Sequence, residues 1–212
     1  MSMFIAQFLT VALVHFFAVA SPGPDFAVVT KNSLVYSRKA GIYTALGIAL
    51  GISIHVAYSL LGIGLVISQS VVIFNAIKFV GAGYLIYIGY KSLRAKPAPP
   101  SEISSVVQPE KQMSSMQAIW NGFLTNVLNP KATLFFLALF TQVINPMTPK
   151  YIQSLFGLEM MFITFVWFAL LALVFSNTII KAKITRVQHY VERATGVVLI
   201  ALGIKVALGG NK

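Results

Sequence analysis

Long apolar runs alternate with short polar segments along the whole chain. A helix needs roughly 20 apolar residues to cross about 30 Å of hydrocarbon, and six runs approach or exceed that length. We predict a helix for each run, because a backbone in lipid must satisfy its own hydrogen-bonding groups. The sixth run is short unless it begins near Val191, so five or six crossings are expected. The predicted membrane segments are 4–20, 42–67, 71–93, 118–144, 152–175 and 195–208.

The composition agrees with a protein whose solvent is the bilayer. Hydrophobic residues make up 57% of the chain and charged residues only 10%, with a mean hydropathy of +0.81. Soluble domains carry about a quarter charged residues, and a soluble fold of this size cannot bury so much apolar surface. Ala18-Val19-Ala20 resembles a signal-peptidase site, but no basic residue precedes the apolar run. We therefore expect an all-α integral membrane protein whose first apolar run is a membrane helix.

Basic residues gather in alternate loops. The second loop, Ser68-Gln69-Ser70, has none, and Lys150 stands alone in the fourth. By the positive-inside rule, the first, third and fifth loops face the cytoplasm and both termini face the periplasm or exterior. This placement explains the net charge of +11 without a nucleic-acid partner. The basic residues are Lys31, Arg38 and Lys39 in the first loop, Arg94, Lys96 and Lys111 in the third, and Lys181, Lys183, Arg186 and Arg193 in the fifth.

One long polar segment, rich in proline, divides the chain. We predict a first three-helix repeat over 1–95, a cytoplasmic linker over 96–116 and a second three-helix repeat over 117–212. Three is odd, so two similar halves must lie in the membrane with opposite orientation. Each half also carries a proline-broken polar motif near its first helix, and the loop charges invert between the halves. Two inverted repeats with broken helices are typical of secondary transporters.

The first broken motif is Ser21-Pro22-Gly23-Pro24-Asp25. Two prolines around a glycine end any continuous helix, and the freed backbone groups must meet protein, water or a ligand. Asp25 then falls in the first turn of a second half-helix, where it could serve a transport site or simply cap that half-helix. A carboxylate at this depth is a candidate proton carrier.

The second broken motif interrupts the apolar stretch from Phe123 to Phe140 and contains Asn126, Asn129, Pro130 and Lys131. The proline frees a helix carbonyl, and the asparagine side chains can donate to a substrate or repair the backbone. A lysine inside a membrane segment costs about 2.5 to 3.5 kcal/mol on insertion scales, which favours a site role. The alternative is that Lys131 extends to an interface.

Other polar residues point to packing more than to chemistry. His15 and His55 lie in apolar helices without clustered acids, and the chain has no cysteine, so we expect packed histidines and no metal site. Gly47 and Gly51 form a G-x-x-x-G face that suits either a homodimer or packing within one chain. No Ser/His/Asp set or phosphate loop is present, so we predict that the chain is not an enzyme and holds no cofactor.

Three stretches carry a family resemblance. They are Leu9 to Phe26 with its SPGPDF motif, Gly81 to Arg94 (GAGYLIYIGYKSLR), and Gly122 to Lys131 with its GFLTN and Asn-Pro-Lys motifs. In this order, over nearly the whole chain, they resemble the LysE superfamily of amino-acid exporters. The SPGPDF form and Ser37-Arg38-Lys39 are most similar to the homoserine/threonine exporter branch, particularly to threonine efflux proteins.

The resemblance implies proton-driven export of neutral amino acids across a bacterial inner membrane. The expected partners are an amino-acid substrate, protons and the lipid bilayer, with Asp25 as the proton-coupling residue. The open alternative is an exporter of another small solute or a cation, since relatives with these motifs differ in what they carry. By resemblance, the translocation path is lined by Pro22, Gly23, Pro24, Asp25, Asn126, Asn129, Pro130 and Lys131.

Overall fold

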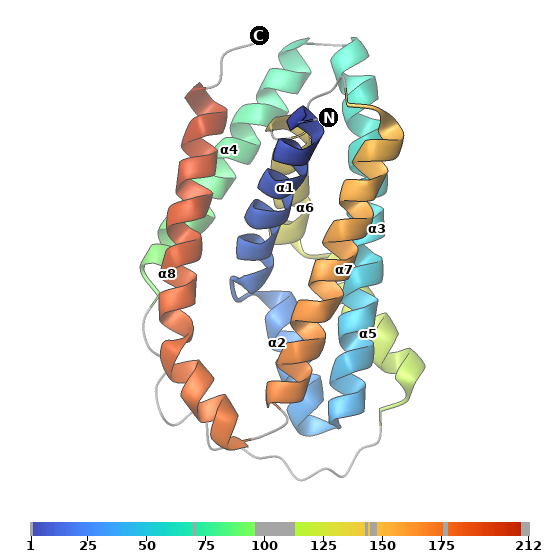
Figure 1. The fold of residues 1–212 in the computed structure, drawn as a ribbon, viewed down its shortest axis with the longest axis vertical. Helices are drawn as coiled ribbons and strands as arrows, with labels where there is room; N and C mark the ends of the chain where they lie inside the picture. Colours follow the sequence, from blue (N-terminus) through green and yellow to red (C-terminus); the bar gives the residue numbers. More distant parts are fainter. Residues whose placement is uncertain are drawn as a thin grey trace.

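The computed structural model describes residues 2–69, 71–95, 113–142, 144, 148–175 and 178–208. Within these ranges the chain forms eight α-helices and no strand, which confirms the predicted all-helical class (Figure 1). The helices are α1 (Ser2–Ala20), α2 (Pro24–Val35), α3 (Arg38–Gln69), α4 (Val71–Leu93), α5 (Ser115–Val127), α6 (Pro130–Gln142), α7 (Lys150–Phe175) and α8 (Thr178–Leu208).

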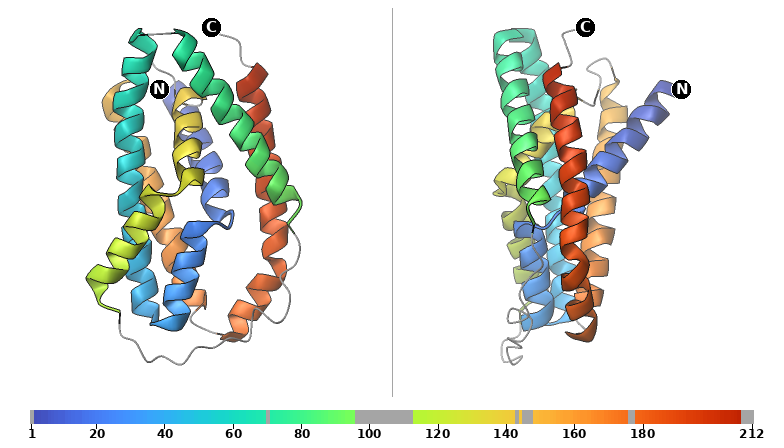
Figure 2. Two further views of the ribbon diagram at one scale, coloured as in Figure 1. Left: turned by 180° about the vertical axis from the view of Figure 1, so that it is seen from behind. Right: turned by 90° about the vertical axis from the view of Figure 1, so that its left-hand side faces the viewer.

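Corresponding helices of the two halves of the chain run through the bundle in opposite directions. In Figures 1 and 2, α1 and α2 descend while α5 and α6 ascend, α3 ascends while α7 descends, and α4 descends while α8 ascends. The third helix packs against the seventh and the fourth against the eighth. These directions agree with the inverted arrangement expected from three-helix halves, while the repeat boundaries themselves stay a prediction.

Both predicted helix breaks are present. The segments Phe4–Ala20 and Pro24–Val35 meet at 57°, and Ser115–Val127 meets Pro130–Phe140 at 58°. In each case a proline occupies the first position of the second helix, where its missing N–H costs nothing and its fixed φ suits the helix. The bends therefore follow from the local sequence and are nearly equal in the two halves.

Length and composition allow four membrane spans among the described residues. Arg38–Leu61 and Lys150–Phe175 qualify by themselves, and each bent pair qualifies as one broken span. The helices α4 and α8 cover the other two predicted segments, with 23 and 31 residues. Their crossing of the membrane stays a prediction.

Two helices extend beyond the predicted apolar segments. The last helix begins at Thr178, ahead of the membrane segment expected from Thr195, because the lysine and arginine residues in its first turns have a high helix propensity. The helix α5 begins at Ser115, inside the predicted linker, because Ser114 and Gln117 form a capping box. The other linker residues, 96–112, lie outside the described part of the chain.

Glycine allows α3 and α5 to approach closely. A Cβ atom at Gly47 would collide with the Ile119 carbonyl, and one at Gly122 would collide with the Thr44 carbonyl. At Gly51 an added Cβ would lie 2.6 Å from the Asn126 side-chain oxygen. The G-x-x-x-G face therefore packs within the chain and is not exposed for a homodimer, and it holds Asn126 in place.

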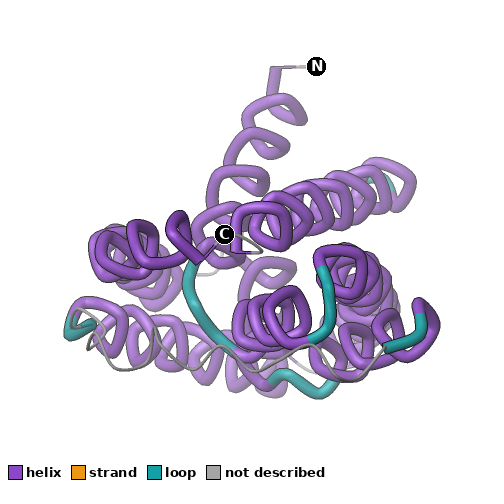
Figure 3. Tube along the Cα trace, turned by 90° about the horizontal axis from the view of Figure 1, so that it is seen from below, coloured by secondary structure: helices purple, strands orange, loops and turns teal. Residues whose placement is uncertain are grey.

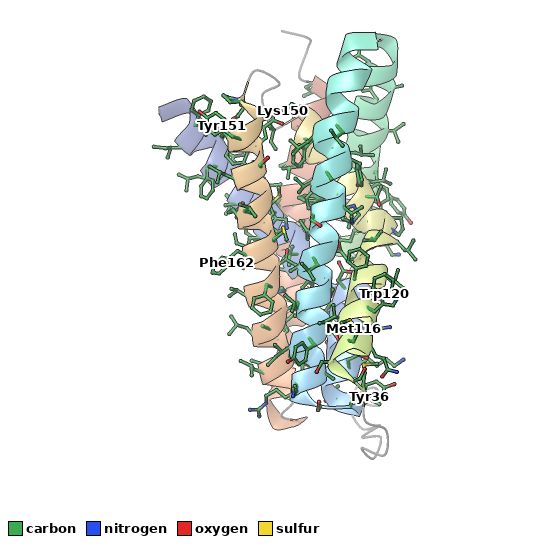
Figure 4. All side chains as sticks on the ribbon, turned by 90° about the vertical axis from the view of Figure 1, so that its right-hand side faces the viewer. Tyr36, Met116, Trp120, Lys150, Tyr151 and Phe162 are labelled. Carbon is green, nitrogen blue, oxygen red and sulfur yellow. The ribbon has the colours of Figure 1, made fainter. Side chains whose placement is uncertain are left out.

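The outer surface suits lipid. Figure 4 shows Phe162 pointing away from the bundle at mid-height, with Tyr36 toward one end and Lys150 and Tyr151 at the other. Aromatic and basic residues near both ends of an apolar band are typical of membrane interfaces. The start of α1 leans out of the bundle in Figures 2 and 3 and carries exposed apolar side chains, namely Ile5, Leu9 and Leu13.

We expect Gly47→Ala and Gly122→Ala to destabilise the protein by about 2 kcal/mol or more, because a clash with helix backbone cannot be relieved by a rotamer change. Thermal unfolding in detergent, followed by size-exclusion chromatography, measures this loss. Gly83→Ala is the matched control, since no atom lies within 4 Å of its added Cβ. Equal melting temperatures for all three variants would contradict the close helix crossing.

Candidate functional site

The two helix breaks face a shared cavity in the middle of the bundle, hereafter the central cavity. Its volume is about 40 Å³, enough for about three water molecules. Along α3 and α7 it lies between two apolar clusters, one around Ile52 and Met160 and the other around Ile48 and Phe168. The cavity is lined by His15, Ala18, Val19, Ser21, Gly23, Asp25, Phe26, Ile52, Asn126, Asn129, Lys131, Ala132, Phe135, Phe136, Thr164 and Phe168.

Both half-helices that start at the breaks share a local pattern. Each begins with a capping residue, a proline and a charged residue, which are Gly23-Pro24-Asp25 in α2 and Asn129-Pro130-Lys131 in α6. The Lys131 backbone N–H donates to Asn129 Oδ1 at 3.0 Å, as expected of an N-cap. Helix N-termini carry partial positive charge and free N–H groups, so two of them beside one cavity favour an anionic group there.

Asp25 and Asn126 join the two halves across the cavity. Asn126 Nδ2 donates to Asp25 Oδ2 at 2.9 Å. In the described part of the chain, Oδ1 of each residue is buried without a hydrogen-bond partner, although the Asn129 amide lies near enough to act on the Asp25 carboxylate electrostatically. Buried polar atoms without partners are rare, so Asp25 Oδ1 marks a place for a ligand or ordered water, whereas Asn126 Oδ1 lies against Gly51 of α3.

Lys131 reaches from α6 to the end of α1. Its Nζ donates to the carbonyls of Ser21 at 2.9 Å and Ala18 at 3.3 Å, which the break leaves without helix partners. An ammonium has three donors, so one remains for the cavity. Lys131 also interacts electrostatically with Asp25 and with Glu192 of α8. The alternative in which Lys131 extends to an interface is therefore excluded, because the side chain is held inside the bundle.

His55 supports the second break from α3. Its Nε2 lies 3.1 Å from the Asn126 carbonyl, which can only accept, so the ring donates there. Its Nδ1 lies 2.8 Å from the Tyr58 hydroxyl, which also lies 3.3 Å from the Thr133 carbonyl. The ring stacks on Phe136 at 5.2 Å. This confirms the expected packed, hydrogen-bonded histidine and shows how the carbonyls of the break are satisfied.

The structure brings five of the eight predicted path residues to the central cavity: Gly23, Asp25, Asn126, Asn129 and Lys131. The three prolines, Pro22, Pro24 and Pro130, do not line it; they shape the breaks that place the others. A role of these residues in substrate binding remains a prediction.

Sequence reasoning missed several residues. It named only Asp25 as a candidate acid, whereas Glu159 lies within α7 with both carboxylate oxygens buried and unpartnered among the described residues. Glu192, near Lys131, was missed too. Glu159 could have been found, because an acid inside an apolar helical run can be recognised in the sequence. His15 and Thr164 line the cavity together although they are 149 residues apart in sequence, a separation no local pattern reveals. Among the described residues no group of three potential metal ligands is present.

Comparison with known proteins adds independent information. The family described as LysE type translocator matches residues 16–210. The chain is 34% identical to the uncharacterized membrane protein YrhP of Bacillus subtilis (strain 168), covering 90% of this chain and 93% of the relative. It is 30% identical to the threonine efflux protein of Escherichia coli (strain K12), covering 95% and 97% respectively. No solved structure matches the chain.

We expect Lys131→Met to lower stability by about 3 kcal/mol, because two buried carbonyls lose a charged donor. The melting temperature in detergent checks this. Lys150→Met is the matched control: Lys150 also donates to a carbonyl, that of Leu60, but on the exposed surface, where water can replace it. If both variants had the melting temperature of the wild type, Lys131 would not stabilise the helix break between α1 and α2.

Proposed function

We propose, from the premise that the chain belongs to the LysE type translocator family, that it exports small neutral amino acids of the threonine and homoserine class in exchange for protons. Members of this family are translocators, so the chain is a membrane transporter and not an enzyme. The substrate class and the coupling ion are the parts that we propose.

The central cavity, with opposite charges on two broken helices, carries the proposal. A free amino acid is a zwitterion, and the cavity offers a complement to each of its charges. Asp25 Oδ1, which is unpartnered among the described residues, can accept from the α-ammonium. The N-termini of α2 and α6, with the third donor of Lys131, can hold the α-carboxylate. A cationic side chain finds no further partner there, because Asp25 is the only acid among the described lining residues.

Export against a gradient needs an energy source, and a zwitterion moves no net charge. A proton that enters as the substrate leaves supplies about 2.3 kcal/mol per 100 mV, enough for roughly a fifty-fold gradient. Asp25 is the proposed carrier, because its carboxylate lines the cavity and would exchange the substrate ammonium for a proton.

The present volume of the cavity supports alternating access. Room for about three waters is too little for an amino acid, so loading requires the helices to separate on one side. We propose that the halves 1–95 and 117–212 rock against each other around the two breaks. The bundle end that carries Arg38, Lys39 and Arg94 would face the cytoplasm, with both termini on the periplasmic side of the inner membrane.

The first test is efflux from preloaded cells that lack their own exporters, comparing threonine, homoserine, serine and lysine with and without a protonophore. We expect protonophore-sensitive loss of the neutral amino acids and retention of lysine. Equal retention of all four, with the protein folded in the membrane, would overturn the amino-acid assignment. Another solute or a cation would then become the substrate to seek.

The second test concerns the proton. We expect Asp25→Asn in proteoliposomes to reduce pH-gradient-driven threonine transport at least tenfold and threonine exchange at equal pH by clearly less, because the amide oxygen still accepts from the ammonium but the side chain cannot release a proton. Glu159→Gln is the matched control, since Glu159 is buried in α7 but does not line the cavity. Intact pH-driven transport in Asp25→Asn would show that the proton role is wrong, and its loss in Glu159→Gln alone would move that role to α7.

A further inference from the structure

A second polar pair lines the central cavity, apart from the charged residues of the breaks. His15 of α1 and Thr164 of α7 are each 1% exposed, and Thr164 Oγ1 lies 3.3 Å from His15 Nε2. The other ring nitrogen, Nδ1, is buried and has no hydrogen-bond partner in the part of the chain that the structure describes. The pair is thus built to bind one more polar group.

The surroundings of the pair are apolar. The His15 ring lies 6.1 Å from the ring of Phe135 and 6.2 Å from that of Phe136. The lining residues from α1, α2, α3 and α7 that complete this region are Val19, Phe26, Ile52 and Phe168. None of these side chains can hydrogen-bond the imidazole, so among the described lining residues Nδ1 is left open to a group that enters the cavity.

We propose that His15 and Thr164 form the side-chain subsite of the transporter and bind the hydroxyl group of a hydroxyamino acid. This inference rests on the proposed function, because it assumes that the α-ammonium and α-carboxylate bind at the two breaks. It assigns recognition of the side-chain hydroxyl, which the threonine and homoserine class shares, to two specific residues.

The chemistry of the pair selects a hydroxyl. In a neutral imidazole one ring nitrogen donates and the other accepts, so Nδ1 needs an acceptor in one tautomer and a donor in the other. A hydroxyl group is both donor and acceptor, and it therefore satisfies either tautomer. A methyl group satisfies neither, and an ammonium side chain would need a second acid that the lining lacks.

The spacing along α1 suits a molecule of this size. His15 precedes Ser21, at the break, by six residues, which is about 9 Å of helical rise. A small amino acid with a hydrogen bond of about 3 Å at each end bridges such a span. The two polar regions of the cavity can therefore hold the two ends of one substrate.

A site that hydrogen-bonds a hydroxyl rejects the analogue that lacks it, because its own buried polar groups are then left unpaired. Valine has the shape of threonine with a methyl in place of the hydroxyl. We expect the wild-type protein to transport threonine at least roughly tenfold faster than valine, compared as rate per substrate concentration.

The experiment measures counterflow of labelled threonine and valine in proteoliposomes for the wild type, Thr164→Val, Thr164→Ser and His15→Phe. We expect Thr164→Val and His15→Phe to bring the threonine-to-valine ratio close to one, mainly by slowing threonine, and Thr164→Ser to retain it. Thr10→Val is the matched control, because Thr10 lies on the exposed face of α1 and bonds only to the Ala6 carbonyl in the described structure. Its ratio should equal that of the wild type.

The outcomes separate this inference from the function on which it rests. Equal transport of threonine and valine by the wild type would overturn the subsite and leave amino-acid export standing. An unchanged preference in a folded Thr164→Val or His15→Phe protein would do the same. If the wild type transported neither amino acid, the proposed function and the subsite would both fall. Equal transport by the wild type overturns the subsite without any variant, and the two substitutions at different helices, Thr164→Val and His15→Phe, keep the assignment testable if one of them fails to fold.

Discussion

Everything in this fold depends on how the backbone groups at two helix breaks are satisfied where lipid offers no hydrogen-bond partner. The carbonyls of Ala18 and Ser21, at the first break, accept from the Lys131 ammonium of the second half. The Asn126 carbonyl, at the second break, accepts from the His55 ring of the first half. Each break thus receives a hydrogen bond from a basic side chain of the opposite half of the chain, and at the second break this bond adds to the one from the Asn129 N–H.

This mutual repair creates a polar layer between two apolar clusters. Along α7 the buried residues change from Met160 through Thr164 to Phe168, and the layer lies at Thr164. Because apolar clusters lie on both sides, the local dielectric is low, and the polar atoms of the layer interact strongly with any polar group that enters. A small cavity with unpaired oxygens and an unpaired ring nitrogen in such a layer is well suited to bind a small polar solute and release it to either side.

The sequence predicted the features that local chemistry determines. Proline and glycine at 21–24 and at 129–130 end any helix in any context, so both breaks were predictable. The pattern could not show which side chains meet across the bundle. The sequence around Lys131 is equally compatible with a side chain that reaches the membrane interface. Only the hydrogen bonds of Lys131 to the end of α1 exclude this placement. Glu159 was missed because attention to polar clusters overlooks one acid in a long apolar helix.

The crossed repairs also have a mechanical consequence. Lys131 ties α6 to the end of α1, and Asn126 ties α5 to the start of α2 through Asp25. Neither bent span can straighten or swing by itself while both ties hold. A proton on Asp25 changes one tie from a charge-assisted hydrogen bond to a neutral one, which is roughly half as strong. The two ties therefore couple the two bent spans, so that a change at Asp25 reaches both halves of the chain.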